Sequence, residues 1–459
     1  VNPTTSGAKL DVTVREVLDV AATRVDRELE DEPAVAASLH ATIGSAYLNL
    51  GLLDEAEEHL VAAHRLYGNP AVMDSEGQAA VRVRRGQLAF DQERFEDAED
   101  LLNSALVARD PETRARALLH LSDLFAAQSR LDKALAAALE ARVLVDSDDV
   151  NDPMLPAQSL SQMGVILYRQ SRYAAAETAM TDAANRARAD LGPAHVLTGE
   201  CTQNLGVVLT ALNRPVEASR TFSEALAIYE GVYPPDHPEF AATLLNLGDA
   251  ETSLGRYREA REDYRQAKVI LEKAPETNRI NWSLAVNGIA HSEWKLGNLP
   301  EADSLFATAV DTIAGLLGPD HPWTAMTRNN LAFVRFESGH PAEAEKMASR
   351  VLGDLEKAFP DGHAYMARPL GLLAEIAMED HRFSESAAWI IRADSLTQSS
   401  SPASAQRISI GLHRARLFQL EGHPSAAEAI LDSLQFLVRD QGEEGKVSRT
   451  RISKLRSGN

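Results

Sequence analysis

Hydrophobic and small residues recur along this chain at helical spacing, in segments joined by short turns. In each unit a small residue lies in a first segment, and an alanine (serine in one unit) follows twelve residues later in a second segment. In most units a larger residue lies four positions further on and a small one three beyond that, as in Gly206, Ala218, Phe222 and Ala225. Offsets of four and three share one face of a helix. The pattern therefore predicts helix pairs that pack closely at the small residues, with the large residue filling the space beside them.

The small position recurs with a nearly constant period. Successive positions are 42 residues apart, except for one interval of 36 and one of 41: Gly44, Gly86, Ser122, Gly164, Gly206, Gly248, Ala290, Ala332, Ala374 and Ala415. A repeat of this length that holds two helices predicts an all-α solenoid of about ten antiparallel helix pairs. The short interval after Gly86 predicts shorter helices near Asp110 and Pro111 and a locally irregular stack.

Glycine and histidine mark the turns. Glycines that supply the left-handed residue after a helix stand at the end of several first helices, at Gly51, Gly255, Gly297 and Gly422. The loops between units are helix breakers, and four of them carry a histidine in the same phase, at His195, His237, His321 and His363. Successive loops of a solenoid are about one repeat apart, so these side chains should not converge on a metal ion. We expect each histidine to cap the helix that follows it.

The small residue, the glycine turn and the Ala-x3-large-x2-Ala second helix together resemble the tetratricopeptide repeat, over residues 34–440. The 42-residue period and the loop Gly318-Pro319-Asp320-His321-Pro322 are similar to the longer subclass found in kinesin light chains and many bacterial proteins. Eight residues beyond the usual 34 would add about 12 Å of helix per pair. The resemblance implies a right-handed superhelical solenoid whose first helices line a concave groove for a protein or peptide ligand.

Two segments flank the repeats. Residues 1–33 are expected to form a lead-in that caps the first repeat, with a helix over residues 10–30 and one apolar stripe of Val14, Val17, Leu18, Ala21 and Val25. Residues 441–459 are expected to form a basic, disordered tail, since no acidic residue follows Gly445. The stretch from Pro33 to Leu53 lacks charged residues but contains enough polar ones to predict a buried helix and no membrane insertion.

Composition narrows the function further. The chain has 46 Lys and Arg against 67 Asp and Glu residues, a formal net charge of −21, which argues against nucleic acid as a partner. The single cysteine, Cys201, excludes internal disulfides and cysteine-cluster metal sites, and we expect it to be a buried thiol. The first residues lack Met and the apolar stretch of a signal peptide, so we expect the chain to be a piece of a longer protein.

No catalytic signature is present. The sequence contains no phosphate-binding loop, nucleophile elbow, zinc-protease motif or protein-kinase motif. We therefore expect no catalytic site, no cofactor and no metal ion in this chain.

Asparagines in the first helices are the first candidates for ligand binding. They precede the small position by two or three residues in four consecutive units, at Asn204, Asn246, Asn287, Asn329 and Asn330. Asparagine inside a helix costs about half a kcal/mol relative to alanine, so its recurrence needs an explanation. The amides could hold a peptide backbone, or they could bond neighbouring helices within the solenoid.

Aromatic residues at helical spacing from these amides are the second candidates: Tyr168, His291, Trp294, Phe333 and Phe336. They could anchor a ligand, or they could pack between repeats. Acidic residues at Glu251, Glu293, Glu375 and Glu379 make the central stretch mixed or acidic. That differs from the Lys/Arg clamp by which chaperone-binding relatives hold a C-terminal carboxylate, so we do not expect such a ligand.

The lead-in carries a second resemblance. Residues 12–19, 24–29 and 43–56 are similar to the segment that opens the repeat region in tetratricopeptide-bearing bacterial serine/threonine protein kinases. In that family a kinase domain and one membrane helix precede the repeats. The resemblance implies that this chain is the non-catalytic, extracytoplasmic sensory region of such a kinase. The alternatives are a cytoplasmic stand-alone adaptor, the repeat part of a transcriptional regulator or secretion assembly, and an enzyme. The sequence leaves the ligand and the oligomeric state open.

Overall fold

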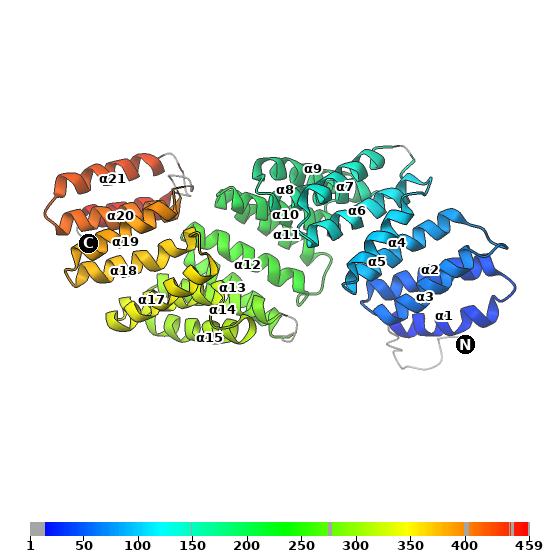
Figure 1. The fold of residues 1–459 in the computed structure, drawn as a ribbon, viewed down its shortest axis with the longest axis horizontal. Helices are drawn as coiled ribbons and strands as arrows, with labels where there is room; N and C mark the ends of the chain where they lie inside the picture. Colours follow the sequence, from blue (N-terminus) through cyan, green and yellow to red (C-terminus); the bar gives the residue numbers. More distant parts are fainter. Residues whose placement is uncertain are drawn as a thin grey trace. The chain divides into compact units, whose positions relative to one another are not determined.

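The fold is built from α-helices throughout the residues that the computed structural model describes, which are 14–147, 149–273, 278–398, 404–439, 441 and 445–457. No strand occurs in these ranges, and the predicted all-α solenoid of helix pairs is confirmed (Figure 1). The helices are α1 Val14–Glu28, α2 Pro33–Asn49, α3 Leu53–Tyr67, α4 Ser75–Asp91, α5 Phe95–Ala105, α6 Pro111–Ala127, α7 Leu131–Val145, α8 Leu155–Arg169, α9 Tyr173–Leu191, α10 Val196–Ala211, α11 Pro215–Glu230, α12 Pro238–Ser253, α13 Tyr257–Leu271, α14 Arg279–Lys295, α15 Leu299–Leu317, α16 Pro322–Glu337, α17 Pro341–Ala358, the 3-10 turn η1 Ala364–Met366, α18 Ala367–Glu379, α19 Phe383–Leu396, α20 Ala405–Leu420, α21 Pro424–Val438 and α22 Lys446–Ser457.

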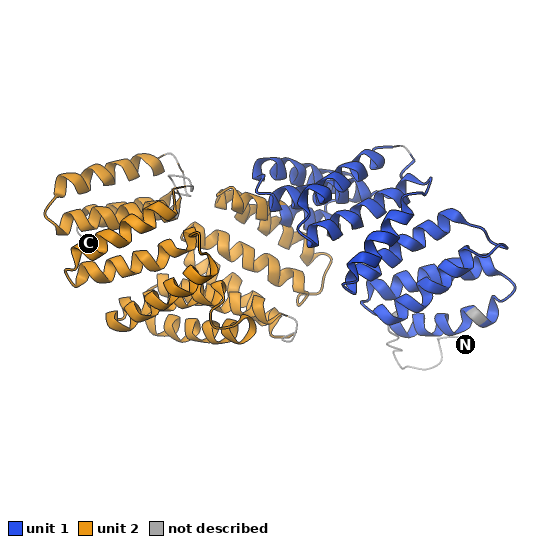
Figure 2. Cartoon of the chain, in the orientation of Figure 1, with its two compact units in different colours: residues 1–204 blue, residues 205–459 orange. Residues whose placement is uncertain are grey.

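The chain forms two compact units, Val1–Asn204 and Leu205–Asn459, and the division falls within α10 (Figure 2). In the first unit α2 to α9 pack in order, each helix on the next, and in the second unit α11 to α21 do the same. First helices of neighbouring pairs also contact one another, as α12, α14, α16, α18 and α20 do in succession. The first helices therefore form the inner face of each stack. The repeat pattern in the sequence gives no sign of the division into two units.

Small and large residues of each pair meet as the spacing predicts. A Cβ atom added to Gly248 would lie 2.7 Å from Cε1 of Tyr264, sixteen residues later, and one added to Gly44 would lie 2.8 Å from Cγ of Leu60. Where serine replaces the small residue it bonds across the pair: Ser122 Oγ donates to the carbonyl of Ala134 at 2.8 Å. Close approach of the two helices thus explains the strongest element of the sequence pattern.

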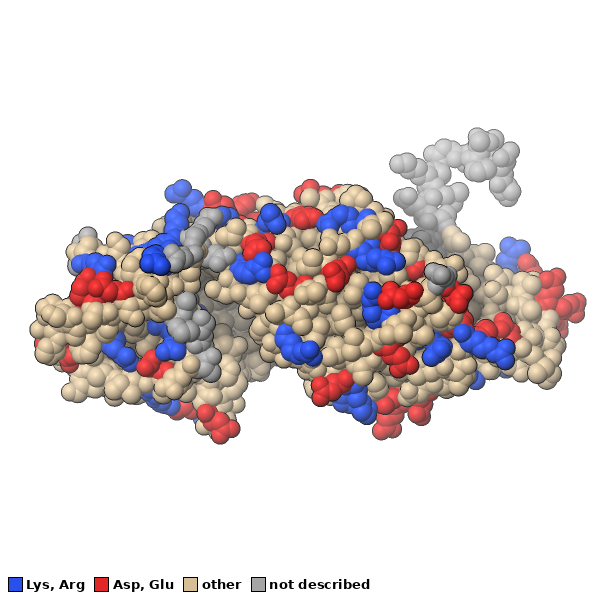
Figure 3. Space-filling view, turned by 90° about the horizontal axis from the view of Figure 1, so that it is seen from above, with Lys and Arg blue, Asp and Glu red and all other residues tan. Residues whose placement is uncertain are grey.

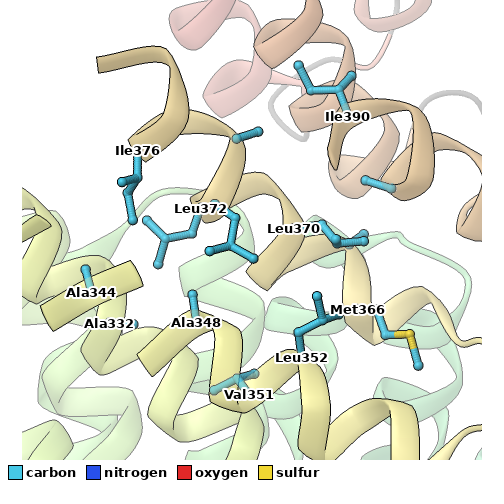
Figure 4. Close-up of a cluster of buried hydrophobic side chains, with 14 of the residues drawn as sticks. Ala332, Ala344, Ala348, Val351, Leu352, Met366, Leu370, Leu372, Ile376 and Ile390 are labelled. Carbon is cyan, nitrogen blue, oxygen red and sulfur yellow. The ribbon is translucent and has the colours of Figure 1, made fainter. Parts of the chain in front are cut away.

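The hydrophobic core is divided into clusters, several of which join neighbouring helix pairs within one unit. Its largest cluster joins α16 through α20 and includes Leu352, Leu370, Leu372, Ile376 and Ile390, all nearly inaccessible to solvent (Figure 4). Each pair leaves one apolar face uncovered, and the next pair buries it, which is how a solenoid gains stability.

The short repeat is shortened in only one helix. α5 has 11 residues, whereas α6, which starts at Pro111, has 17. The prediction of shorter helices near Asp110 and Pro111 is right for α5 and wrong for α6. Asp110 caps α6 by accepting from the backbone N–H groups of Glu112 and Thr113. This cap, followed by Pro111 at the first helical position, stabilises the start of α6.

The turns carry the expected chemistry. Gly51, Gly255, Gly297 and Gly422 have φ of 73°, 75°, 89° and 81°, in the left-handed region. The four loop histidines cap the following helices, which confirms their predicted role. Each accepts a backbone N–H on Nδ1: Leu197 on His195, Glu239 on His237, Trp323 on His321 and Tyr365 on His363, at 3.1 to 3.3 Å.

The lead-in helix is α1, which packs on the first repeat through Leu18, Ala21 and Val25. Val17 belongs to the predicted stripe, but it is 58% exposed, so that part of the prediction is wrong. Ala22 and Leu29 contact the repeat, because the buried face is rotated relative to the predicted one. Residues 10–13 of the predicted helix lie outside the described residues.

The C-terminal segment differs from the predicted disordered tail, because Lys446–Ser457 form the helix α22. Ile452 is fully buried against α20 and α21, and Leu455 packs beside it on the same helical face. Arg456 pairs with Glu428 and Asp432 of α21, each at 2.7 Å. The basic charge of this segment suggested disorder, but burial of Ile452 and Leu455, two of its three apolar residues, stabilises the helix.

Buried charges lock neighbouring repeats together. Glu293 of α14 is 3% exposed and accepts from Arg261 and Arg265 of α13, at 3.2 and 3.0 Å. One repeat later the charges are exchanged: Arg335 of α16 donates to Asp303 of α15 at 2.8 Å. Glu251 is also buried and accepts from Ser219 Oγ of α11 at 2.5 Å, so two of the acidic positions assigned to the central surface, Glu251 and Glu293, lie within repeat contacts instead.

Two findings on membrane spans and metal-ligating groups apply to the ranges that the structure describes. No helix there is long and apolar enough to cross a membrane. No group of three potential metal-ligating side chains occurs there either.

Candidate functional site: a pocket on the inner face of the second unit

A pocket of about 800 Å³ opens on the inner face of the second unit. Its walls are formed by the first helices α14, α16, α18 and α20, by the α12–α13 turn, and by α22. This volume lies within the 300 to 1,000 Å³ that is typical of ligand sites. The pocket is thus large enough for a small ligand or a short stretch of peptide.

One wall is aromatic. The ring of Trp294 stacks with that of Phe333 at 5.7 Å between centroids and meets His291 edge to face at 5.6 Å. Trp294 Nε1 donates to Glu337 at 2.8 Å, and Lys295 Nζ lies 3.3 Å from the centre of the Trp294 ring. Because Trp294 is only 7% exposed, the more open Phe333 and Lys295 present this wall to a ligand.

The opposite wall holds a carboxylate and an imidazole. His413 Nε2 lies 3.4 Å from Glu375 Oε1, and a Cβ atom on Gly371 would lie 2.8 Å from His413 Cε1, so the glycine makes room for the ring. Burial opposes ionisation of Glu375, but the hydrogen bond from His413 and the nearby Arg416 outweigh it, and the pKa of Glu375 is lowered. Glu375 is therefore ionised at neutral pH.

Cations from two parts of the second unit line the pocket. Arg368 of α18 and Lys295 of α14 come from the repeats, and Arg451 comes from α22. All three remain open to solvent through the pocket, yet the surrounding protein lowers the pKa of each through burial, that of Lys295 to about 8. Burial, with Lys295 and Arg368, also lowers the pKa of His291 to about 3, so this imidazole is neutral.

The predicted aromatic candidates are only partly brought together. His291, Trp294 and Phe333 line the pocket. Phe336 is half-buried against the core cluster of α16 to α20. Tyr168 belongs to the first unit, where its ring lies 5.6 Å from that of Tyr173.

Two of the five candidate asparagines bond neighbouring helices of the solenoid. Asn330 Nδ2 donates to Asn287 Oδ1 at 3.3 Å, and Arg368 donates to Asn330 Oδ1 at 2.9 Å, so these amides link three successive first helices. Asn329 is 2% exposed, and neither atom of its amide has a partner in the described part of the chain. Asn204 and Asn246 are half-buried, in the first and second unit respectively.

The repeat period could have identified more of the site. His291, Phe333 and Glu375 are one repeat apart, at the position just after the small residue, and Lys295 and Glu337 are likewise 42 residues apart. Extending the phase of the aromatic candidates would therefore have found Glu375. Arg451 could not be found in this way, because α22 lies outside the repeats.

The charge of the pocket is opposite to that of the chain. Among the lining residues, Lys295, Arg368, Lys446, Arg451 and Lys454 oppose only Glu337 and Glu375, an excess of 5 − 2 = 3 positive charges. The whole chain carries −21, and acidic and basic side chains are interspersed over the face shown in Figure 3. The prediction of a mixed or acidic central surface is therefore wrong for this pocket.

Cys201 does not line this pocket. It is fully buried in the core of the first unit, and burial raises the pKa of its thiol to about 11. The prediction of a buried thiol is confirmed.

Stacked helix pairs with a ligand-sized pocket on the inner face define a helical-repeat scaffold. Models described as tetratricopeptide repeat match residues 37–69, 83–149, 155–231, 217–273 and 282–357, which is more than half of the chain. The chain belongs to the tetratricopeptide repeat family. No curated protein matches the sequence.

Two solved structures show the same fold at low identity, and a third is similar over a smaller part of the chain. The apo form of RapI is 13% identical, with a TM-score of 0.58, over 83% of this chain and 99% of that one. A signal-transduction ATPase with a tetratricopeptide repeat sensor, PH0952 from Pyrococcus horikoshii, is 12% identical, with a TM-score of 0.56, over 79% of this chain and 53% of that one. A putative kinesin light chain from Podosopora anserina is 19% identical, with a TM-score of 0.40, over 46% of this chain and 98% of that one.

Proposed function

We propose that this repeat scaffold is non-catalytic and binds a peptide or protein segment on the inner face of its second unit. The observation that supports this most directly is the pocket itself, which is lined by the first helices of four consecutive pairs. A ligand lying there would contact several repeats at once, as extended peptides do in grooves of this kind.

The chemistry of the walls suits such a ligand. Phe333 and Tyr257 are half-buried and can pack against apolar side chains, which supply most of the energy of an interface. Arg368 is held in place by Asn330, and its remaining N–H groups can donate to peptide carbonyls or to acidic side chains. In this proposal Asn330, supported by Asn287, positions Arg368 and does not bind the peptide backbone directly.

A binding experiment tests the proposal. Peptides selected from a random display library on the whole chain would be titrated against Phe333→Ala, with expected weakening of about tenfold or more, the loss typical of an aromatic anchor. Phe436→Ala is the matched control, because Phe436 is 67% exposed on α21 and lies outside the pocket. Equal affinities for the two variants, both folded by circular dichroism, would exclude this pocket as the peptide site.

We further propose that the chain is the sensory or regulatory region of a bacterial serine/threonine protein kinase, with catalysis in another part of the parent protein. The support is the resemblance of residues 12–19, 24–29 and 43–56, of which residues 12 and 13 lie outside the described residues. PH0952 is described as carrying its repeats as a sensor, and we extend that role to this chain by analogy of fold.

An antibody against this chain tests the kinase proposal in the source cells. A membrane-bound species well above 49.9 kDa that phosphorylates itself is the expected result, and it would support the kinase proposal and direct the search to an external or envelope ligand. A free species near that mass would refute the proposal and favour the stand-alone adaptor.

A further inference from the structure

The second unit closes its own pocket with the C-terminal helix. α22 rests on α20 and α21 through Ile452, and its other face turns Lys446, Arg451 and Lys454 toward the pocket. At its N-terminal end Val447 approaches the α12–α13 turn so closely that a Cβ atom on Gly255 would lie 2.8 Å from Val447 Cγ2. α22 therefore spans the open side of the inner face, from the last repeat to the turn of a much earlier one.

The positive groups around the pocket have only neutral partners at close range. Arg368 donates to the amide of Asn330, Arg451 donates to Ser409 Oγ at 3.1 Å, and Lys295 lies on the Trp294 ring. No ion pair joins Lys295, Arg368 or Arg451 to a carboxylate within the described ranges. Each guanidinium has five N–H donors, so one neutral partner leaves donors for a ligand.

The two carboxylates of the pocket are already engaged. Glu337 accepts from Trp294 Nε1, and Glu375 faces His413 and Arg416. Burial lowers the pKa of Lys295, and Arg451 and Arg368 add to this effect while Glu337 and Glu375 oppose it, so the charges of both arginines reach this amine. Like charges brought together in a partly desolvated site attract an anion that can bridge them.

A single carboxylate carries one charge and would leave most of this excess uncompensated. A phosphate monoester carries nearly two negative charges and three acceptor oxygens on one compact group, and guanidinium groups match its geometry. Clusters of arginines recognise phosphorylated side chains in peptides by this chemistry.

We propose that the peptide bound by this pocket is phosphorylated on serine or threonine, and that Arg368, Lys295 and Arg451 hold the phosphate while α22 closes over it. The inference rests on the proposed peptide-binding function and adds the chemical class of its ligand. Because Arg451 comes from α22 and the other two cations from the repeats, a bound phosphate bridges the helix to the repeats.

Two degenerate peptide libraries test the proposal on the full chain, identical except that the fixed central residue is phosphoserine in one and serine in the other. The phosphorylated library should bind about tenfold tighter or more, because two arginines would contact the added group. A third library with a central glutamate should resemble serine more than phosphoserine. Inorganic phosphate and pyrophosphate, added as competitors, distinguish recognition of a phosphopeptide from simple capture of a free phosphate.

Variants assign the effect to the pocket. The double variant Arg368→Gln, Arg451→Gln should bind both libraries with similar affinity. Arg456→Gln is the matched control on the same helix, because Arg456 pairs with Glu428 and Asp432 away from the pocket, and it should keep the preference. Exchange of the α22 amide hydrogens should slow when the phosphorylated library is bound and stay unchanged with the serine library.

Each remaining outcome separates the two proposals. Equal binding of the phosphoserine and serine libraries would overturn the phosphate inference and leave peptide binding standing. A preference that survives in Arg368→Gln, Arg451→Gln would place phosphate recognition elsewhere and overturn the inference as well. Binding of neither library would overturn both proposals, and tight binding of free pyrophosphate without peptide binding would replace the peptide by a small phosphate.

Discussion

Gly206 of α10 lies directly against the ring of Phe222 in α11, so that a methyl group on Gly206 would come within 2.5 Å of Phe222 Cε1. Phe222 is 1% exposed, and its ring is enclosed by the neighbouring repeat. Glycine inside a helix is ordinarily unfavourable, and this contact explains why the position is occupied by glycine in five repeats.

Replacement of Gly206 by alanine should therefore destabilise the second unit. Overpacking of a closed core costs about 1–3 kcal/mol, which exceeds the gain of about 1 kcal/mol in helix propensity. The midpoint of urea unfolding should fall. Gly353→Ala is the control, since no atom lies within 4 Å of the added Cβ, and it should raise the midpoint. Parallel effects at the two positions would contradict the packing explanation.

The turn between the two helices of a pair needs a left-handed residue in every repeat. Ser171 adopts φ of 59° there, whereas Gly297 has φ of 89° with open space around its Cβ position. Ser171→Gly should stabilise the chain by about 0.5 kcal/mol, and Gly297→Ser should destabilise it by about 0.5–1 kcal/mol. Thermal unfolding should show a higher midpoint temperature for Ser171→Gly and a lower one for Gly297→Ser. A lower midpoint for Ser171→Gly would contradict the prediction.

Asp263 makes the stability of the second unit depend on pH. Burial, together with Glu251, Glu262 and Glu259, raises the pKa of its carboxyl from 3.8 to about 7. The folded state thus holds the proton more tightly than the unfolded chain, and the stability linked to it is complete below about pH 4 and lost as the pH rises through about 7.

Asp263→Asn removes this dependence. The variant should equal the wild type near pH 4 and be more stable at pH 8, by on the order of 1 kcal/mol. Unfolding curves at the two pH values measure the difference. Asp311→Asn, the same change at an exposed carboxylate of α15, is the matched control. If Asp263→Asn is no more stable than the wild type at pH 8, the ionised Asp263 carboxylate is well solvated in the folded state and the prediction is wrong.

Lys295 should be unusually reactive toward amine reagents. Burial lowers the pKa of its side chain from 10.5 to about 8, and this side chain is open to the pocket. A large fraction of Lys295 is therefore in the reactive, unprotonated amine form at pH 8. Acylation followed by mass spectrometry should give a labelling midpoint near pH 8 for Lys295. Lys357, exposed on α17, is the reference. If Lys295 reacts no faster than Lys357 at pH 8, burial does not lower the pKa of Lys295.

The repeat phase was predictable because it depends on contacts inside a single pair. Gly248 and Tyr264 belong to one repeat, and their spacing is fixed by helix geometry, so the sequence alone indicates that they meet. The histidine caps were predictable for the same reason, since His321 acts on the N–H two residues later. His291 and Phe333 were placed in a candidate groove, and both line the pocket.

The features that the sequence did not predict depend on contacts between segments that are distant along the chain. Arg451 and Tyr257 line one pocket although almost two hundred residues separate them, and no period relates them. The position of α22 depends on the packing of Ile452 against an apolar surface, which forms only when α20 and α21 are folded together. Asn330 was a candidate for binding a ligand, but its amide bonds Asn287 and Arg368, because neighbouring first helices contact one another.

The exchange of charge between successive repeats also fixes their order. Arg261 meets Glu293 at one boundary, and one repeat later Asp303 meets Arg335 with the signs reversed. Excision of the 42 residues between these boundaries would leave the hydrophobic pattern in register, yet it would bring Arg261 opposite Arg335. Two like charges at a half-buried boundary oppose each other and cost free energy. The repeats of this chain are therefore alike in shape but not interchangeable, and a chain that slipped by one repeat during folding, or lost one by recombination, would be selected against by charge alone.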